Sequence, residues 1–162
     1  VAGSGIYLKN AAYDEQMISA IQNAQVELYY DNSKKVETTS TGASVTGLLT
    51  ATTSANITQV ALTSASSVSW DARAAANAFL SLGHNVTFAA PSNAVEGAII
   101  SVEIAQPGSG GPYTVAWNTV FEFAASTAPT MTATASKTDI FSFRYNGSIW
   151  QEIGRVQNLA QT

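Results

Sequence analysis

The sequence predicts an all-β protein in two parts: a short trimeric, β-rich shaft, followed by a β-sandwich or jelly-roll-like head. Only 11% of the 162 residues are charged, compared with about 25% in a typical domain. Thr and Ser replace the missing charges, which suits exposed strands because β-branched Thr fits the pleat while staying polar. Short alternating runs separated by turns recur along the chain. Large apolar residues become dense after residue 68, so we expect a shaft over 1–50, a linker over 51–67 and a head over 68–162.

The first 24 residues leave their secondary structure open. GIYLKN alternates like a strand. In the run that follows, Tyr13, Met17 and Ile21 fit one face of a helix, whereas Met17, Ser19 and Ile21 fit one face of a strand, and periodicity cannot decide over so short a run. The chain begins with Val1 rather than Met, so we expect it to be either a processed chain or the C-terminal part of a longer protein, and we favour the second.

The segment VELYYDNSKKVETTSTGASVTG, residues 26–47, reads as three thin strands joined by turns. Asp31-Asn32-Ser33 is typical of a turn, because Asx side chains bond the local backbone and tolerate positive φ. Each strand carries only two or three apolar residues, too few to offset an ordering cost of about 1–2 kcal/mol per residue. We therefore expect three chains to pool these stripes around a common axis. The predicted trimer interface consists of Val26, Leu28, Tyr30, Val36 and Val45.

The Thr/Ser/Ala-rich segment that follows reads as a linker with one or two strands. From Val68 onward, short strands separated by turns every 8–12 residues predict the sandwich. Asn146-Gly147 is a strong hairpin signal between two such strands. One alternative remains within 71–80, where the alanines of DARAAANAFL also fit a single helical turn.

Composition excludes several classes of function. A net charge of −4, with Lys34-Lys35 as the only basic pair, argues against nucleic-acid binding. The absence of cysteine excludes disulfide scaffolds and thiolate metal sites. No run of about 18 apolar residues exists, so no membrane insertion is expected.

The sequence offers few candidate catalytic residues. His84 is the only histidine, and its Gly-His-Asn context is typical of a solvated turn. The carboxylates are scattered, the GSGG stretch at 108–111 has no following Lys-Ser/Thr, and no calcium-loop spacing appears. We therefore predict no enzyme activity, no catalytic residues, no cofactor and no metal.

The aromatic residues have two interpretations. Trp70, Trp117, Trp150 and Tyr113 would suit a sugar-stacking platform, but the tryptophans are more simply core residues of alternating strands. Tyr113 follows Gly-Gly-Pro and is expected to be the most exposed of the four.

Two stretches resemble known proteins. Residues 26–47 resemble a segment of fibre and tail-fibre proteins of bacteriophages, especially those of marine bacteria and cyanobacteria, where it forms a repetitive β-rich shaft. GIYLKNAAYDEQMISAIQNA resembles the units that precede it. The stretch from NVTFAAPSN through GSGGPYTVAW and TAPT to KTDIFSFRYNGSIWQEIG resembles a terminal module of phage appendages.

This resemblance implies a homotrimeric fibre protein in the virion, on tail or capsid, that contacts other virion proteins and recognises a host surface glycan. We expect the contact loops to lie at one end of the sandwich, over 83–85, 107–113, 126–129 and 146–148. The candidate receptor-binding residues are His84, Asn85, Tyr113 and Asn146. Two alternatives remain: a capsid or tail decoration or joint protein that binds no receptor, and a polysaccharide depolymerase, for which the chain is too short.

Overall fold

The computed structural model describes residues 4–160, so Val1 lies outside the described part. The chain divides into two compact units, with the boundary between Ala55 and Asn56. The described residues form strands and one three-residue 3-10 helix, η1 (Ala124–Ser126), which confirms the predicted all-β class. No helix among them is long and apolar enough to cross a membrane.

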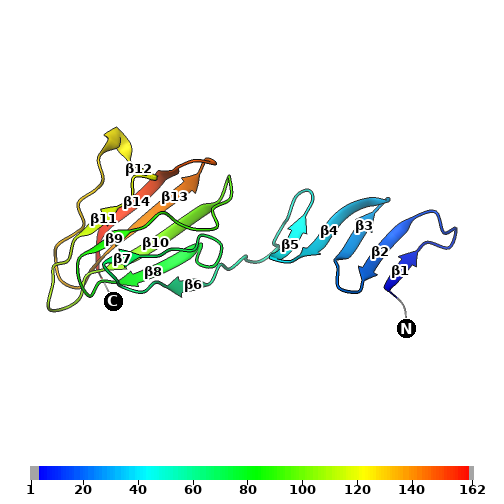
Figure 1. Ribbon diagram of the computed structural model, residues 1–162, viewed down its shortest axis with the longest axis horizontal. Helices are drawn as coiled ribbons and strands as arrows, with labels where there is room; N and C mark the ends of the chain where they lie inside the picture. The colour runs from blue at the N-terminus through cyan, green and yellow to red at the C-terminus, as the bar shows by residue number, and fades with distance from the viewer. Residues whose placement is uncertain (1–3, 161–162) are drawn as a thin grey trace. The chain divides into compact units, whose positions relative to one another are not determined.

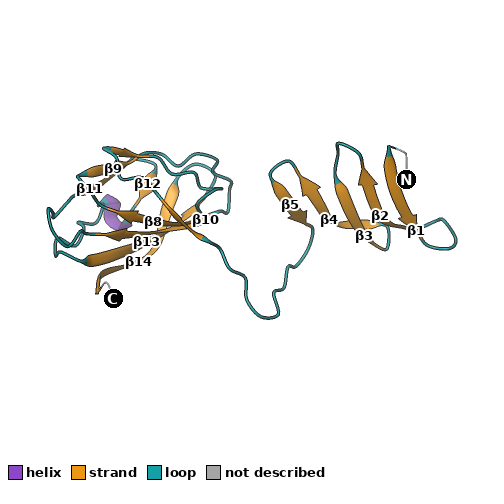
Figure 2. Cartoon of the chain, turned by 90° about the horizontal axis from the view of Figure 1, so that it is seen from below, coloured by secondary structure: helices purple, strands orange, loops and turns teal. Residues whose placement is uncertain are grey.

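The first unit is a five-stranded antiparallel meander in the order β1-β2-β3-β4-β5. Figures 1 and 2 show these strands in one row, with no second layer of the unit over either face. Residues 16–21 are a strand, so alternation rather than helical spacing was the correct reading of that run. The strands are β1 (Gly5–Lys9), β2 (Gln16–Ile21), β3 (Val26–Tyr30), β4 (Ser33–Thr39) and β5 (Gly42–Val45).

The predicted turn between β3 and β4 is present. Asp31 and Asn32 have φ values of 50° and 55°, which suits the two central residues of a tight hairpin. The Asn32 side chain also accepts a hydrogen bond from the Gln16 backbone N–H (2.7 Å) and donates to the Asp14 carbonyl (3.1 Å). This turn therefore also fixes the start of β2.

The second unit is a β-sandwich of a six-stranded sheet, β12-β14-β13-β10-β8-β6, and a three-stranded sheet, β11-β9-β7. From β6 to β11 successive strands alternate between the two sheets, so neighbours in this region run parallel. This winding differs from the antiparallel pairing of a jelly-roll. The strands are β6 (Gln59–Ala61), β7 (Ser67–Val68), β8 (Asn77–Ser81), β9 (Val86–Phe88), β10 (Ile99–Ala105), β11 (Val115–Trp117), β12 (Phe121–Glu122), β13 (Lys137–Tyr145) and β14 (Trp150–Ala160).

The predicted linker of 51–67 is too long. β6 pairs with β8, and the Leu62 N–H donates to the Phe79 carbonyl at 2.7 Å. Val60 and Leu62 pack against the core of the second unit. Two apolar residues are enough to hold this strand in place because β8 pairs with it along its length. The surrounding residues are polar, which is why the sequence suggested a linker.

The remaining expectations for the head concern one hairpin and one short turn. β13 and β14 form the predicted hairpin, closed by the Asn146 N–H donating to the Ile149 carbonyl at 3.1 Å. Residues 72–74 form one turn, in which the Ala75 N–H donates to the Asp71 carbonyl four residues earlier at 2.9 Å, and no helix follows it because β8 begins at Asn77.

Aromatic side chains fill the space between the two sheets. Trp70 and Trp150 are 1% exposed, which confirms them as core residues. Trp117 differs, because it remains half-buried at the edge of the cluster while five phenylalanine rings lie within 5.5 Å of it. These rings are Phe88, Phe121, Phe123, Phe141 and Phe143.

A buried carboxylate ties three segments of the second unit together. Asp139 accepts hydrogen bonds from the Thr132 N–H (2.8 Å), the Gln157 side chain (3.0 Å) and the Asn158 N–H (2.9 Å). Burial alone would raise the pKa of Asp139, but these hydrogen bonds together outweigh burial and hold the pKa below its ordinary value. The charged form is therefore the one that the fold stabilises.

Asp139→Asn should destabilise the second unit by about 1–3 kcal/mol, because an amide cannot accept from all three donors. Since the folded pKa is lowered, the contribution of Asp139 is present above the ordinary Asp range and is lost as pH falls through the folded value. Urea denaturation followed by tryptophan fluorescence reports this unit alone, because all three tryptophans lie in it. Glu103→Gln, on the opposite face of neighbouring strand β10, is the matched control. Equal stability of both variants would contradict the role of Asp139.

Candidate functional site: an uncovered apolar sheet face

One face of the first unit is aliphatic across all five strands. Strand register places Leu8 opposite Ile18, Ile18 opposite Leu28, Leu28 opposite Val36, and Val36 opposite Val45. Paired residues in antiparallel strands point to the same side of the sheet. These five side chains therefore form one continuous row perpendicular to the strands.

A second row runs beside it over the first three strands, where Ile6 is opposite Ala20 and Ala20 is opposite Val26. No other segment covers either row among residues 4–55, the described part of this unit, and Ile6, Leu8, Leu28 and Val45 are 40–55% exposed. We call this surface the apolar face, made of Ile6, Leu8, Ile18, Ala20, Val26, Leu28, Val36 and Val45.

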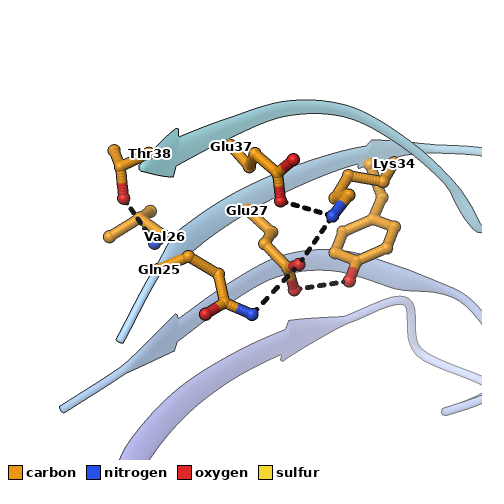
Figure 3. A network of polar contacts seen from close by, with 7 residues as sticks. Gln25, Val26, Glu27, Lys34, Glu37 and Thr38 are labelled. Carbon is orange, nitrogen blue, oxygen red and sulfur yellow. Dashed lines mark hydrogen bonds and ion pairs between the residues drawn. The ribbon is translucent and has the colours of Figure 1, made fainter. Parts of the chain in front are cut away.

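The opposite face carries a polar network that covers itself (Figure 3). Glu27 is only 8% exposed, although the sheet is a single layer. It accepts hydrogen bonds from the Tyr29 hydroxyl (2.7 Å) and Gln25 (3.4 Å) and an ion pair from Lys34 (3.3 Å). Lys34 also contacts the Glu37 carboxylate. The polar side chains of this face therefore find their hydrogen-bond and ion-pair partners within one chain.

The network shifts the ionisation of its members. The hydrogen bond from Tyr29 lowers the pKa of Glu27 against the opposing effect of burial, and Lys34 and Gln25 lower it further. The same hydrogen bond raises the pKa of the Tyr29 hydroxyl. Hydrogen bonds to Glu37 and then to Glu27 raise the pKa of Lys34. Each shift favours the state found in the network: a carboxylate, a neutral phenol and an ammonium.

The two faces therefore make different demands. A sheet with one hydrophobic face needs a covering layer for independent stability, and each Leu or Val that becomes fully buried contributes about 1.5–3 kcal/mol. The first unit supplies no such layer among its described residues. Its apolar face is the candidate functional site, and an exposed aliphatic surface of this kind is suited to binding another apolar surface.

The predicted trimer-interface residues fall on this face. Val26, Leu28, Val36 and Val45 belong to its two rows, and Tyr30 lies on the same side by alternation along β3, 75% exposed at the strand end. Sequence reasoning missed the members that come from β1 and β2: the period of residues 13–24 was ambiguous for β2, and the strand-like alternation of β1 did not reveal which strand it pairs with. Their signal is the register, which aligns each of them with a predicted neighbour.

The four predicted receptor residues do not come together. β10 runs from Ile99, paired beside the 146–149 turn, to Ala105, whose carbonyl accepts from Leu82 beside residues 83–85. At about 3.3 Å per residue, the seven residues of β10 separate the two ends by roughly 20 Å. His84, Asn85 and Tyr113 lie at one end and Asn146 at the other. The expectation of one shared contact surface is wrong.

Three of these side chains have structural contacts. Asn85 accepts a hydrogen bond from the Thr114 N–H at 2.9 Å. Asn146 accepts from the backbone N–H groups of two residues of its own turn, at 3.0 and 2.9 Å. Tyr113 is half-buried against the core rather than prominent, and its backbone is held by Gln106 on both sides. His84 is exposed in its turn.

Across residues 4–160, no group of three or more His, Asp or Glu side chains lies close enough to hold a metal ion. No protein-family model matches the chain, and no curated protein matches it significantly. The resemblance to phage fibre proteins remains a prediction from the sequence.

Adjacent substitutions on β5 test the role of the apolar face. Val45→Lys should reduce the assembly to monomers at micromolar concentration, because a buried unpaired ammonium is costly. Ser44→Lys should leave the assembly intact, because Ser44 pairs with Glu37 on the polar face. Sedimentation equilibrium measures both masses. A wild-type monomer, or equal masses for the two variants, would contradict the assignment.

The polar network predicts a stability window for the first unit. The contribution of Glu27, whose pKa is lowered, is lost as pH falls below its ordinary value of 4.5 and through its folded value. The contributions of Tyr29 and Lys34, whose pKa values are raised, are lost as pH rises above about 10. In circular-dichroism melts, Glu27→Gln should lack the acid-dependent loss of the first unit that the wild type shows, whereas the loss in the second unit, followed separately by tryptophan fluorescence, should remain. Glu15→Gln, also in the first unit, should retain the first-unit loss, and loss of acid dependence in both variants would implicate other groups.

Proposed function

We propose that the chain is a structural, non-enzymatic virion fibre protein of a bacteriophage. In this proposal the first unit joins three copies into a shaft, and the second unit contacts a host surface glycan. The observation that supports the proposal is the apolar face, whose aliphatic rows are not covered by any described residue of the first unit, whereas the side chains of the polar face cover one another. The sequence resemblance of residues 26–47 to phage shaft segments supports the same arrangement.

The shape of the apolar face favours three copies. The stripe is five strands long, two residues wide over β1–β3 and one residue wide over β4 and β5, so it extends about 20 Å along the direction in which strands stack. A narrow, continuous stripe suits one wall of a closed three-sided assembly with cyclic symmetry. A two-fold sandwich would cover the same rows, and sedimentation equilibrium distinguishes it by a mass of two chains rather than three.

Three linked copies also give the second unit a mechanism for adhesion. Surface polysaccharides repeat, and linking weak sites raises the overall affinity by about 10²–10⁴ without any new contact. The proposal therefore requires only a weak site on each head and involves no catalytic step.

A second function is favoured by one specific observation. The residues predicted to bind receptor lie at opposite ends of the second unit, and several of them hold turns. This favours a capsid or tail decoration or joint protein that docks on the virion without binding a receptor.

Adsorption separates the two functions. The wild-type assembly should bind bacterial cells or immobilised surface polysaccharide about 10²–10⁴ times more tightly than monomeric Val45→Lys, with Ser44→Lys behaving like the wild type. Binding only to virions would establish the decoration instead. A wild-type protein that binds no more tightly than Val45→Lys would refute adhesion through linked copies.

A further inference from the structure

A pocket of about 420 Å³ opens on the second unit beside Trp117. This volume lies within the range of about 300–1,000 Å³ that is typical of small-molecule sites. Four segments converge on it: the end of β11 with the turn that follows, β12, the loop at η1, and the β13–β14 turn. The residues that matter for its chemistry are Trp117, Asn118, Thr119, Glu122, Ser126 and Ala128.

Trp117 gives the pocket a rigid aromatic wall. Its ring stacks on Phe88 with centroids 4.7 Å apart and planes at 11°, and Phe141 meets it edge-on at 5.2 Å. Unlike Trp70, whose indole N–H donates to the Ala75 carbonyl at 2.8 Å, Trp117 has a buried N–H with no acceptor among the described residues. Hydrogen bonding within the fold therefore does not explain why a tryptophan stands at position 117. Its ring reaches the surface, whereas Trp70 and Trp150 are fully buried.

The polar groups of the pocket are oriented by the protein but have free hydrogen-bonding capacity. The side-chain amide oxygen of Asn118 accepts a hydrogen bond from the Val120 N–H (3.1 Å). The side-chain NH₂ group of Asn118 has no partner among the described residues. One Glu122 oxygen accepts from Gln151 (3.0 Å), which leaves the other free. The hydroxyls of Thr119 and Ser126 also have no partner among the described residues. Donors and acceptors thus stand side by side around one aromatic ring.

The loop that carries Ser126 is strained. Ala125 and Ser126 are consecutive non-glycine residues with φ values of 54°, in a region that L-residues rarely occupy. Such strain persists where the surroundings enforce it, and it is concentrated at functional sites. Here it positions Ser126 at the wall of the pocket.

We infer that this pocket binds a neutral sugar ring. A pyranose has an apolar C–H face that can pack on the Trp117 ring, and neighbouring hydroxyls that both donate and accept, as an amide, a carboxylate and two hydroxyls require. No Lys or Arg lines the pocket and one carboxylate does, so an anionic ligand is disfavoured. The inference deepens the proposed function and rests on it for the source of the sugar, a host surface glycan. It places the site away from His84, Asn85 and Tyr113.

Tryptophan fluorescence of the full-length chain tests the site directly. Trp117 is the only tryptophan that is not fully buried, so acrylamide quenching should report mainly on this residue. Glucose, galactose, mannose, N-acetylglucosamine and their β-linked dimers, each at millimolar concentration, are the probes. We expect at least one to reduce quenching. If none does, the inference is overturned.

Two substitutions localise the binding. Glu122→Gln should weaken binding about tenfold or more, because it removes a charged acceptor while keeping a bond to Gln151. Glu103→Gln is matched to it, since Glu103 also accepts from one glutamine, Gln59 (3.1 Å), on the outer face of the sheet, and it should bind like the wild type. Ala128→Trp, on the exposed rim, should block the pocket; because it adds a fourth tryptophan, its sugar binding is measured by isothermal titration calorimetry and its fold by far-ultraviolet circular dichroism. An unchanged near-ultraviolet spectrum confirms that the two glutamine variants are folded. Sugar binding that survives in both Glu122→Gln and Ala128→Trp would overturn the site.

The outcomes separate this inference from the proposed function. If the chain is monomeric but Glu122→Gln weakens sugar binding and Ala128→Trp abolishes it, the pocket stands and the trimeric fibre fails. If the trimer adsorbs to cells and Ala128→Trp adsorbs equally well, adhesion stands and the pocket is refuted as its site.

Discussion

The first unit depends on one constraint: a single layer of strands has two faces and no interior. Its polar face meets this constraint within the chain, because Tyr29 and Lys34 close over Glu27 and leave it 8% exposed. Its apolar face does not, because an aliphatic row from Leu8 to Val45 can be removed from water only by another layer. The polar face is closed and the aliphatic face is open, and the proposed self-association would supply the missing layer over the aliphatic face.

The second unit meets the same constraint differently. Its chain crosses from one sheet to the other after every strand from β6 to β11. Both sheets therefore contribute side chains to one core, in which the aromatic residues pack together. Asp139 fixes one end of this sandwich through three hydrogen bonds that offset its burial. With the core closed, the pocket beside Trp117 is the surface to which we assign recognition.

Recognition by such a protein does not need one strong site. The residues most suggestive of binding in the sequence, His84 and Asn146, are separated by the length of β10, and most of the turn side chains around them hold backbone N–H groups in place. The pocket at Trp117 combines a ring packed against five phenylalanines with donors and acceptors that have no partner among the described residues. These features would suit a weak site if linkage of several copies multiplies its binding, as we propose. Assembly through the first unit and a modest site on the second would therefore act together.

The sequence by itself determined the all-β class, the Asp31-Asn32 turn, the β13–β14 hairpin, the core positions of Trp70 and Trp150, and the sidedness of β3, because each of these follows from alternation or from the local chemistry of a turn. It could not determine the period of residues 13–24, because so short a run fits both a helix and a strand. It could not determine the start of the second unit, because β6 is stabilised by pairing with the distant strand β8. Nor could it determine that Trp117 is only half-buried. Only the tertiary structure decided the rows of the apolar face and the ends at which the loops lie. Register and strand order set both, and they depend on contacts between residues far apart in the chain.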